Sequence, residues 1–191
     1  MKRTALLLGF TFLCFSFITF SQNNTIKTHG IFYKISLATT LAINDDYGEF
    51  GHEDETFFVP SALFVNNTFG YQFDRRALIG LNFEYDYHSK QGLHFFPAYL
   101  NFQYNIIHYE DVINGSIFSN VFIRGGYGTF LSLGKSFEKG NMYKLGLGYQ
   151  EGIDENNNFI LFGLDFTRKR FGYRTLEGLS SISIFLEFMV F

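Results

Sequence analysis

An unbroken two-residue alternation between Ile79 and His88 constrains this chain more than any other feature of its sequence. Every odd position in the stretch is apolar or aromatic, whereas the even positions hold Gly80, Asn82, Glu84, Asp86 and His88. Successive side chains of a β-strand point to opposite faces, so the stretch predicts a strand with one apolar and one polar face. The rest of the chain repeats this pattern, and its function depends on what each face contacts.

Seven further stretches show the same alternation, and they predict strands at about 30–42, 58–73, 94–105, 116–128, 141–151, 159–168 and 180–191. The stretch at 116–128 is apolar on both faces, and there we place Val121, Ile123 and Tyr127 outward. Asn67 interrupts an apolar face and indicates a bulge. Eight strands joined in sequence, without a helical crossover, predict an all-β fold: an antiparallel up-and-down barrel.

The N-terminus has the pattern of a targeting segment. Lys2 and Arg3 precede an uncharged apolar run over residues 5–20, which predicts a signal peptide at 1–21, cleaved after Ser21, and a barrel domain at 22–191. The run is short for a membrane helix, and an uncleaved anchor is the alternative. Cys14 is the only cysteine, so the mature domain has no disulfide. The formal charge of −3 comes with no basic patch of the kind that binds nucleic acid.

The residue types on the polar faces indicate that the apolar faces point outward. The polar positions are mostly Gly, Asn, Ser, Thr, Gln and Ala, whereas a water-exposed face is usually rich in Lys and Glu. The apolar faces carry Leu, Ile and Phe, with Tyr and Phe near strand ends, as a lipid-facing band between aromatic girdles does. We therefore predict a transmembrane barrel. A soluble lipocalin-like ligand-binding barrel, with the same alternation inverted, is the alternative.

The export segment, the eight-strand pattern and the last strand, S-I-S-I-F-L-E-F-M-V-F, together resemble a known group. Residues 30–191 resemble the small eight-stranded outer-membrane barrels, the OmpA/OmpX-like group and the related outer membrane protein beta-barrel domain family. Phe191, with Met189 and Phe185 at alternate positions before it, is similar to the signal that the barrel-insertion machinery reads; Glu187 departs from that pattern.

The resemblance implies an orientation in the outer membrane of a Gram-negative envelope. Both termini would lie in the periplasm, with turns at 74–76, 106–115 and 152–158 on the same side. Loops at 43–57, 88–93, 129–140 and 168–179 would face the cell exterior. Outer-membrane lipid and lipopolysaccharide would surround the barrel.

Several charged residues fall on the inward phase: Lys34, Glu84, Asp86, Arg124, Lys144, Asp165 and Glu187. An eight-stranded barrel is just wide enough for its side chains to fill, and an unpaired buried charge costs several kcal/mol. We therefore expect a packed salt-bridge core, with a gated ion path as the alternative. The first and last strands should be neighbours, so we expect Lys34 and Glu187 to approach each other.

Two loops are strongly charged. The last loop contains Arg168, Lys169, Arg170 and Arg174, which we interpret as candidates for contact with lipopolysaccharide phosphates. The first loop contains Asp45, Asp46, Glu49, His52, Glu53, Asp54 and Glu55, which could bind a divalent cation through oxygen ligands. That loop lacks a full EF-hand pattern, so we interpret it as a solvated charge run and predict no metal site and no cofactor.

The end of the third strand carries residue types that could serve in catalysis. Some outer-membrane barrels modify lipid A with Ser and His, and Asp86, His88, Ser89 and His94 lie close together in this sequence. Adjacent strand residues point to opposite faces, so His88 and Ser89 fit poorly as a nucleophile and base. We interpret His88 as a rim residue bonded to Asp86.

The sequence thus favours a non-catalytic outer-membrane barrel in envelope structure, surface interaction or assembly with another envelope protein. A lipid A acylhydrolase or acyltransferase is the alternative from the enzyme class.

Overall fold

The computed structural model describes residues 29–43, 58–89, 92–111, 117–134, 137, 139–153, 158–173 and 176–191. The predicted signal peptide, the acidic loop at 44–55 and Arg174 lie outside the described residues. The described residues form nine strands: β1 (Gly30–Ile43), β2 (Phe58–Gln72), β3 (Ala77–His88), β4 (Leu93–Phe95), β5 (Pro97–Asp111), β6 (Ile117–Phe130), β7 (Gly140–Gly152), β8 (Phe159–Tyr173) and β9 (Leu176–Val190). Among the described residues, no helix is long and apolar enough to cross a membrane.

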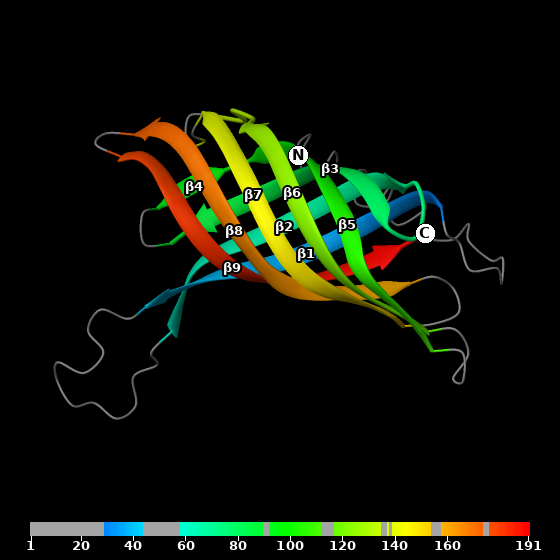
Figure 1. Ribbon diagram of the computed structural model, residues 1–191. Coiled ribbons are helices and arrows are strands. Elements are labelled where there is room, and N and C mark those ends of the chain that lie inside the picture. The colour runs from blue at the N-terminus through cyan, green and yellow to red at the C-terminus, as the bar shows by residue number, and fades with distance from the viewer. Residues whose placement is uncertain are drawn as a thin grey trace, which may run out of the picture.

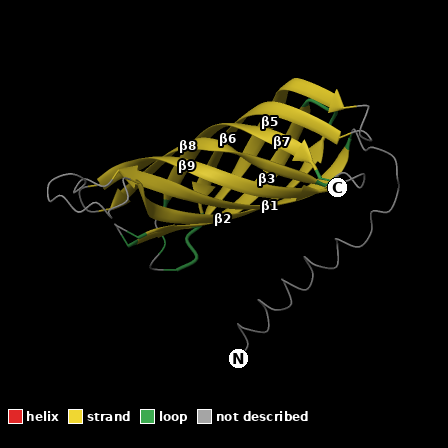
Figure 2. Cartoon of the chain, turned by 90° about the horizontal axis from the view of Figure 1, so that it is seen from below, coloured by secondary structure: helices red, strands yellow, loops and turns green. Residues whose placement is uncertain are grey.

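The strands close into a ring. Every neighbouring pair runs antiparallel, and the pairings of β2 with β3 and of β1 with β9 complete the circle. β4 and β5 both pair with β3 and are separated only at Phe96, so they form one wall of the barrel. The nine strands therefore make a closed eight-stranded up-and-down barrel, which confirms the predicted fold class (Figure 1). Figure 2 shows the strands wrapping obliquely around this barrel.

Two predicted connections are wrong because paired strands fill most of them. β5 runs to Asp111, so residues 106–111 of the turn expected at 106–115 are strand, with a register shift between Asn105 and Ile107. β8 ends at Tyr173 and β9 begins at Leu176, so residues 168–173 and 176–179 of the loop expected at 168–179 are strand as well. Backbone pairing continues there beyond the apolar runs, because ladder hydrogen bonds do not depend on apolar side chains.

The bulge expected at Asn67 is also wrong. The register of β2 passes through Asn67 without a shift, and the shift between β1 and β2 lies instead at Thr40 and Leu41. The Asn67 side chain accepts a 2.5 Å hydrogen bond from the hydroxyl of Tyr33. A polar residue on the outward face is accommodated here by a cross-strand partner, so the strand stays regular.

The seam between β1 and β9 is shorter than the strands that form it. Pairing runs from Tyr33 opposite Val190 to Thr40 opposite Ser183 and then stops. Beyond that point β1 continues with β2 alone and β9 with β8 alone. In Figure 1 the blue end of β1 and the orange-red start of β9 diverge on the left.

Two apolar clusters fill the interior, one toward each end of the barrel. The cluster at the end that carries the termini of the barrel, Gly30 and Phe191, comprises Phe32, Leu78, Phe122, Phe159, Leu161, Phe185 and Met189. The cluster at the opposite end comprises Leu93, Phe95, Tyr99, Phe130, Met142 and Phe171. Buried polar and charged side chains occupy the space between them. Exposed apolar side chains surround the barrel, and Ile123 and Tyr127 are among them, as predicted for the ambiguous strand.

Candidate functional site

Strand alternation gathers eight charged side chains inside the barrel, which we call the ionic core. The buried cations are Lys34, Arg124, Lys144 and Lys169, and the buried anions are Glu84, Asp86, Asp165 and Glu187. All seven residues expected on the inward phase are present, and Lys169 joins them. Within the described residues, four positive and four negative charges therefore balance, as a low-dielectric interior requires.

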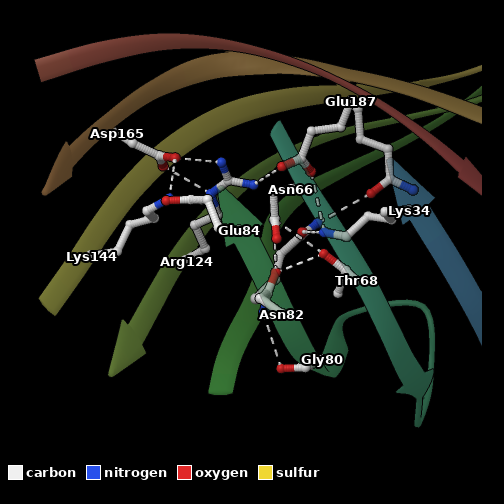
Figure 3. A network of polar contacts seen from close by, with 12 residues as sticks. Lys34, Asn66, Thr68, Gly80, Asn82, Glu84, Arg124, Lys144, Asp165 and Glu187 are labelled. Atoms are coloured by element: carbon white, nitrogen blue, oxygen red, sulfur yellow. Dashed lines mark hydrogen bonds and ion pairs between the residues drawn. The ribbon is translucent and has the colours of Figure 1, made fainter. Parts of the chain in front are cut away.

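Arg124 on β6 holds the centre of the ionic core. Its Nε and Nη2 atoms donate to Asp165 Oδ1 and Oδ2 at 2.9 and 2.6 Å, and its Nη1 donates to Glu187 Oε1 at 2.6 Å (Figure 3). The guanidinium carbon also lies 3.8 Å from the centroid of the Phe185 ring. One side chain thus connects β8 with β9 and contacts the apolar cluster near the termini, which fixes its position.

Lys34 occupies the same region from β1. Its Nζ atom lies 3.2 Å from Glu187 Oε2, as the adjacency of the first and last strands predicted. It also donates to Gln103 Oε1 at 3.4 Å. Glu187 therefore receives two cations, one on each carboxylate oxygen, and links the closing seam of the barrel to Arg124.

Lys144 and Glu84 form the next part of the ionic core. Their Nζ and Oε2 atoms are 2.5 Å apart, and the hydroxyl of Tyr99 donates to the same oxygen at 2.9 Å. Lys144 Nζ also lies 4.0 Å from Asp165 Oδ2, which joins this pair to the Arg124 contacts.

A neutral ladder of amides extends from this region along the wall. Asn82 Oδ1 accepts hydrogen bonds from Asn66 Nδ2 at 3.0 Å and from Thr68 Oγ1 at 2.6 Å. The side-chain nitrogen of Asn82, Nδ2, donates to the Gly80 carbonyl at 3.2 Å. These three small polar residues of β2 and β3 therefore bond to one another across neighbouring strands, as Figure 3 shows.

The placement of Lys169 corrects the sequence interpretation. It was expected in an external loop, but its Nζ atom is buried 2.6 Å from Asp86 Oδ2 and 2.9 Å from His88 Nε2. The same ammonium group lies 4.9 Å from the centroid of the Phe95 ring. Alternation continues through β8, so Lys169 shares the inward face with Asp165. The sequence already shows this two-residue alternation, and it would have identified Lys169 as an inward residue if the predicted strand had continued past residue 168.

His88 is a buried residue and not a rim residue, so this expectation is wrong as well. Its imidazole is 3% exposed and packs at 5.5 Å between ring centroids against both Phe64 and Phe95. An ammonium group can only donate, so His88 accepts from Lys169 through Nε2. The expected bond to Asp86 is replaced by this shared contact with one lysine.

The residues weighed for catalysis are not brought together. Ser89 is exposed, and its hydroxyl donates to the Ser61 carbonyl at 3.0 Å. His94 lies on the other side of the wall, where its Nδ1 is 2.9 Å from the Tyr85 hydroxyl and its ring stacks on Tyr87. In the described part of the chain, this cluster therefore contains no Ser–His hydrogen bond of the kind that activates a nucleophile. The described side chains also include no group of three or more His, Cys, Asp or Glu arranged to hold a metal ion.

The remaining candidates lie at opposite ends of the barrel. Phe185 and Met189 are buried in the interior, and the ring of Phe191 lies 6.1 Å from that of Phe32. Their recognition by the insertion machinery stays a prediction. Of the residues expected to contact lipopolysaccharide, Arg168 and Arg170 are exposed on the outer surface.

Comparison with solved structures finds the N-terminal beta-barrel domain of Pseudomonas aeruginosa OprF. The two chains share 12% sequence identity with a TM-score of 0.47, over 85% of this chain and 99% of that one. No family model matches the sequence, and no curated protein matches it significantly.

Proposed function

We propose that this protein is an integral outer-membrane β-barrel with a non-catalytic role, acting as an envelope scaffold that presents its loops at the cell surface. The observation that carries the proposal is the inversion of polarity between its two surfaces. Lys34, Arg124 and Glu187 are buried, whereas Leu147 and Ile182 are 58% and 61% exposed. Water disfavours such a surface, and the hydrocarbon of a bilayer favours it.

The exposed apolar side chains form a belt around the barrel. Each wall contributes to it: Leu37, Leu63, Leu81, Leu100, Ile123, Leu147, Phe162 and Leu186. Tyrosines such as Tyr87 and Tyr143 are also exposed, nearer the end opposite the termini, where an interfacial girdle is expected. A soluble ligand-binding barrel would carry its apolar side chains inside, so this arrangement favours the membrane over the lipocalin-like alternative.

The interior supports a scaffold rather than a pore. Phe122 and Phe185 pack together at one end, and Phe95 and Phe130 at the other, with the ionic core between them. An ion that crossed the barrel would have to break buried charge pairs and pass both apolar clusters. We propose that export by the signal peptide, insertion by the barrel-assembly machinery and any contact with another envelope protein complete this role.

Membrane integration is tested by placing a charge in the apolar belt. Leu147→Arg should cost about 2–4 kcal/mol near the bilayer midplane and should reduce the amount of folded protein in outer-membrane fractions. Leu133→Arg is the matched control, because Leu133 is equally exposed but lies in a loop beyond β6. Recovery of the wild-type protein in a soluble fraction without detergent would refute the proposal.

The absence of catalysis has its own test. Mass spectrometry of lipid A from a strain lacking this protein should match that from the parent strain. A change in acyl-chain number that is restored by the wild-type gene would instead establish a lipid A-modifying enzyme.

A further inference from the structure

Arg168 and Arg170 form a cationic pair on the outer surface of β8, which we call the arginine pair. They lie two residues apart on one strand, so both point outward and their Cα atoms are roughly 7 Å apart. Lys169 between them points inward, so the basic run of the sequence splits into an internal and an external part. The external part lies near the end of the barrel that is opposite the termini.

Neighbouring side chains hold both guanidinium groups against the wall. Arg168 Nη1 donates to Ser180 Oγ on β9 at 2.7 Å. The Arg170 guanidinium carbon lies 5.5 Å from the centroid of the Tyr143 ring on β7. Tyr143 in turn packs on Tyr127 of β6 at 5.2 Å between ring centroids. The pair is thus partly oriented before any ligand binds, which lowers the entropic cost of binding.

The arginine pair retains donors for a ligand. Neither guanidinium lies within ion-pair distance of a carboxylate anywhere in the part of the chain that the structure describes. Both side chains are exposed. Arg168 uses one of its five donors on Ser180, so most of its planar fork remains available.

The position of the arginine pair beside the apolar belt indicates that its ligand belongs to the bilayer. Directly toward the barrel middle, the same outward faces carry Leu145, Phe166 and Ile182, all of them strongly exposed. Along the wall, the aliphatic belt is therefore followed by Tyr143, which lies opposite Arg168, and then by Arg170 one step further out. In a bilayer, the hydrocarbon is followed by the interface with its phosphates.

We propose that the arginine pair binds the phosphate of a phosphorylated glycolipid in the outer leaflet, with lipid A as the representative ligand. The inference rests on the proposed function, because the orientation of the barrel places this end at the cell surface. Two guanidinium forks can donate parallel hydrogen bonds to one phosphate, and the adjacent tyrosines pack against the lipid body. Lys169 takes no part in this site, because it is buried against Asp86.

The test measures binding of lipid A to the purified protein in neutral detergent. Arg168→Gln with Arg170→Gln should weaken binding by about tenfold, because several charge-assisted hydrogen bonds are lost at an exposed site. The matched control is Arg75→Gln with Arg76→Gln, which removes the same charge from an exposed turn at the opposite end. This control should bind lipid A like the wild type. Arg168→Lys with Arg170→Lys should fall between them, since charge remains but the fork is lost.

Three results would overturn the proposal. Equal binding by the wild type and the glutamine pair would remove the site, and equal losses in both glutamine pairs would reduce the effect to net charge. Undiminished binding of dephosphorylated lipid A would exclude the phosphate as the ligand group. Competition by inorganic phosphate alone at comparable concentration would assign the site to free phosphate and not to a lipid. Membrane integration of the Arg168 and Arg170 variants is measured in parallel, so failure here is distinguishable from failure of the proposed function.

Discussion

Arg124 and Asp165 meet inside the barrel through the space left by Gly146, which stands between them on β7. The register places Gly146 opposite Arg124 on one side and opposite Asp165 on the other. Two hydrogen bonds of 2.9 and 2.6 Å cross this position. A Cβ atom at Gly146 would overlap Asp165 Oδ1 and would lie 3.0 Å from Arg124 Cγ. The small residue and the ion pair are therefore parts of one arrangement.

Gly146→Ala should destabilise the protein by about 1–3 kcal/mol, because the added methyl group displaces the buried ion pair. Urea unfolding in detergent or lipid vesicles measures the change. Gly172→Ala is the matched control on β8, where an added Cβ meets no atom within 4 Å, and it should stay within about 0.5 kcal/mol of the wild type. Similar stability of the two variants would contradict the packing described for Arg124.

Lys169→Met should destabilise the barrel by about 3–5 kcal/mol, because it leaves Asp86 buried without its cation. Adding Asp86→Asn to this variant should restore part of the loss, since the uncompensated charge is then removed. The same unfolding assay reports both effects. Binding of lipid A to Lys169→Met that still folds should equal that of the wild type, and a loss of lipid binding there would place Lys169 in the external site.

The protein should show no sustained conductance in planar bilayers, because apolar clusters fill both ends of its interior. Arg124→Ala should remain closed too, since Phe95 and Phe130 still pack at one end and Phe32 and Phe159 at the other. Single-channel recording of both proteins is the measurement. Stepwise currents from the wild type would instead favour an ion path through the ionic core.

Stability should depend on Asp74 in acid. The backbone N–H groups of Ala77 and Arg76 donate to Asp74 Oδ1 at 2.7 Å each, and they hold the pKa of Asp74 below its ordinary value of 3.8. The native state binds this proton more weakly than the unfolded state does, so the contribution is present above pH 3.8 and is lost as pH falls through the lower native pKa.

Asp74→Ala tests this relationship through unfolding curves recorded at several pH values. The stability difference between wild type and variant should be largest at neutral pH and should shrink below pH 3.8. A difference that stays constant across this range would show that the turn gains nothing from the carboxylate charge.

Much of this fold follows from side-chain parity alone. The alternation from Ile79 to His88 predicts both faces of β3, and the same rule places Lys34 and Glu187 with their side chains inward. Barrel closure then makes their strands neighbours. This alternation is a local property with a period of two residues, so it can be read from the sequence without knowledge of tertiary contacts. The strand ends did not follow in the same way. β8 continues to Tyr173 through polar residues that resemble a loop in composition.

Partner choice within the ionic core was harder to predict than location. Glu84 could have met Lys34, Arg124 or Lys144 by composition, and only the stagger of the strands selects Lys144. The pairing of Asp86 with Lys169 was not predicted, because the predicted strand ended at residue 168 and so left Lys169 outside the interior. His88 was likewise assigned to the rim because it ends the predicted strand, whereas β4 brings Phe95 against its ring inside the barrel.

The short seam between β1 and β9 bears on the order in which the barrel assembles. Every other seam joins strands that follow one another in the chain, whereas this one brings Tyr33 against Val190. Hairpins close short loops at little entropic cost, while joining the two ends of the chain costs more before any contact forms. We expect this seam to form last during folding. Pulsed hydrogen exchange should then find the amides of β1 facing β9 protected later than those of the β6–β7 hairpin.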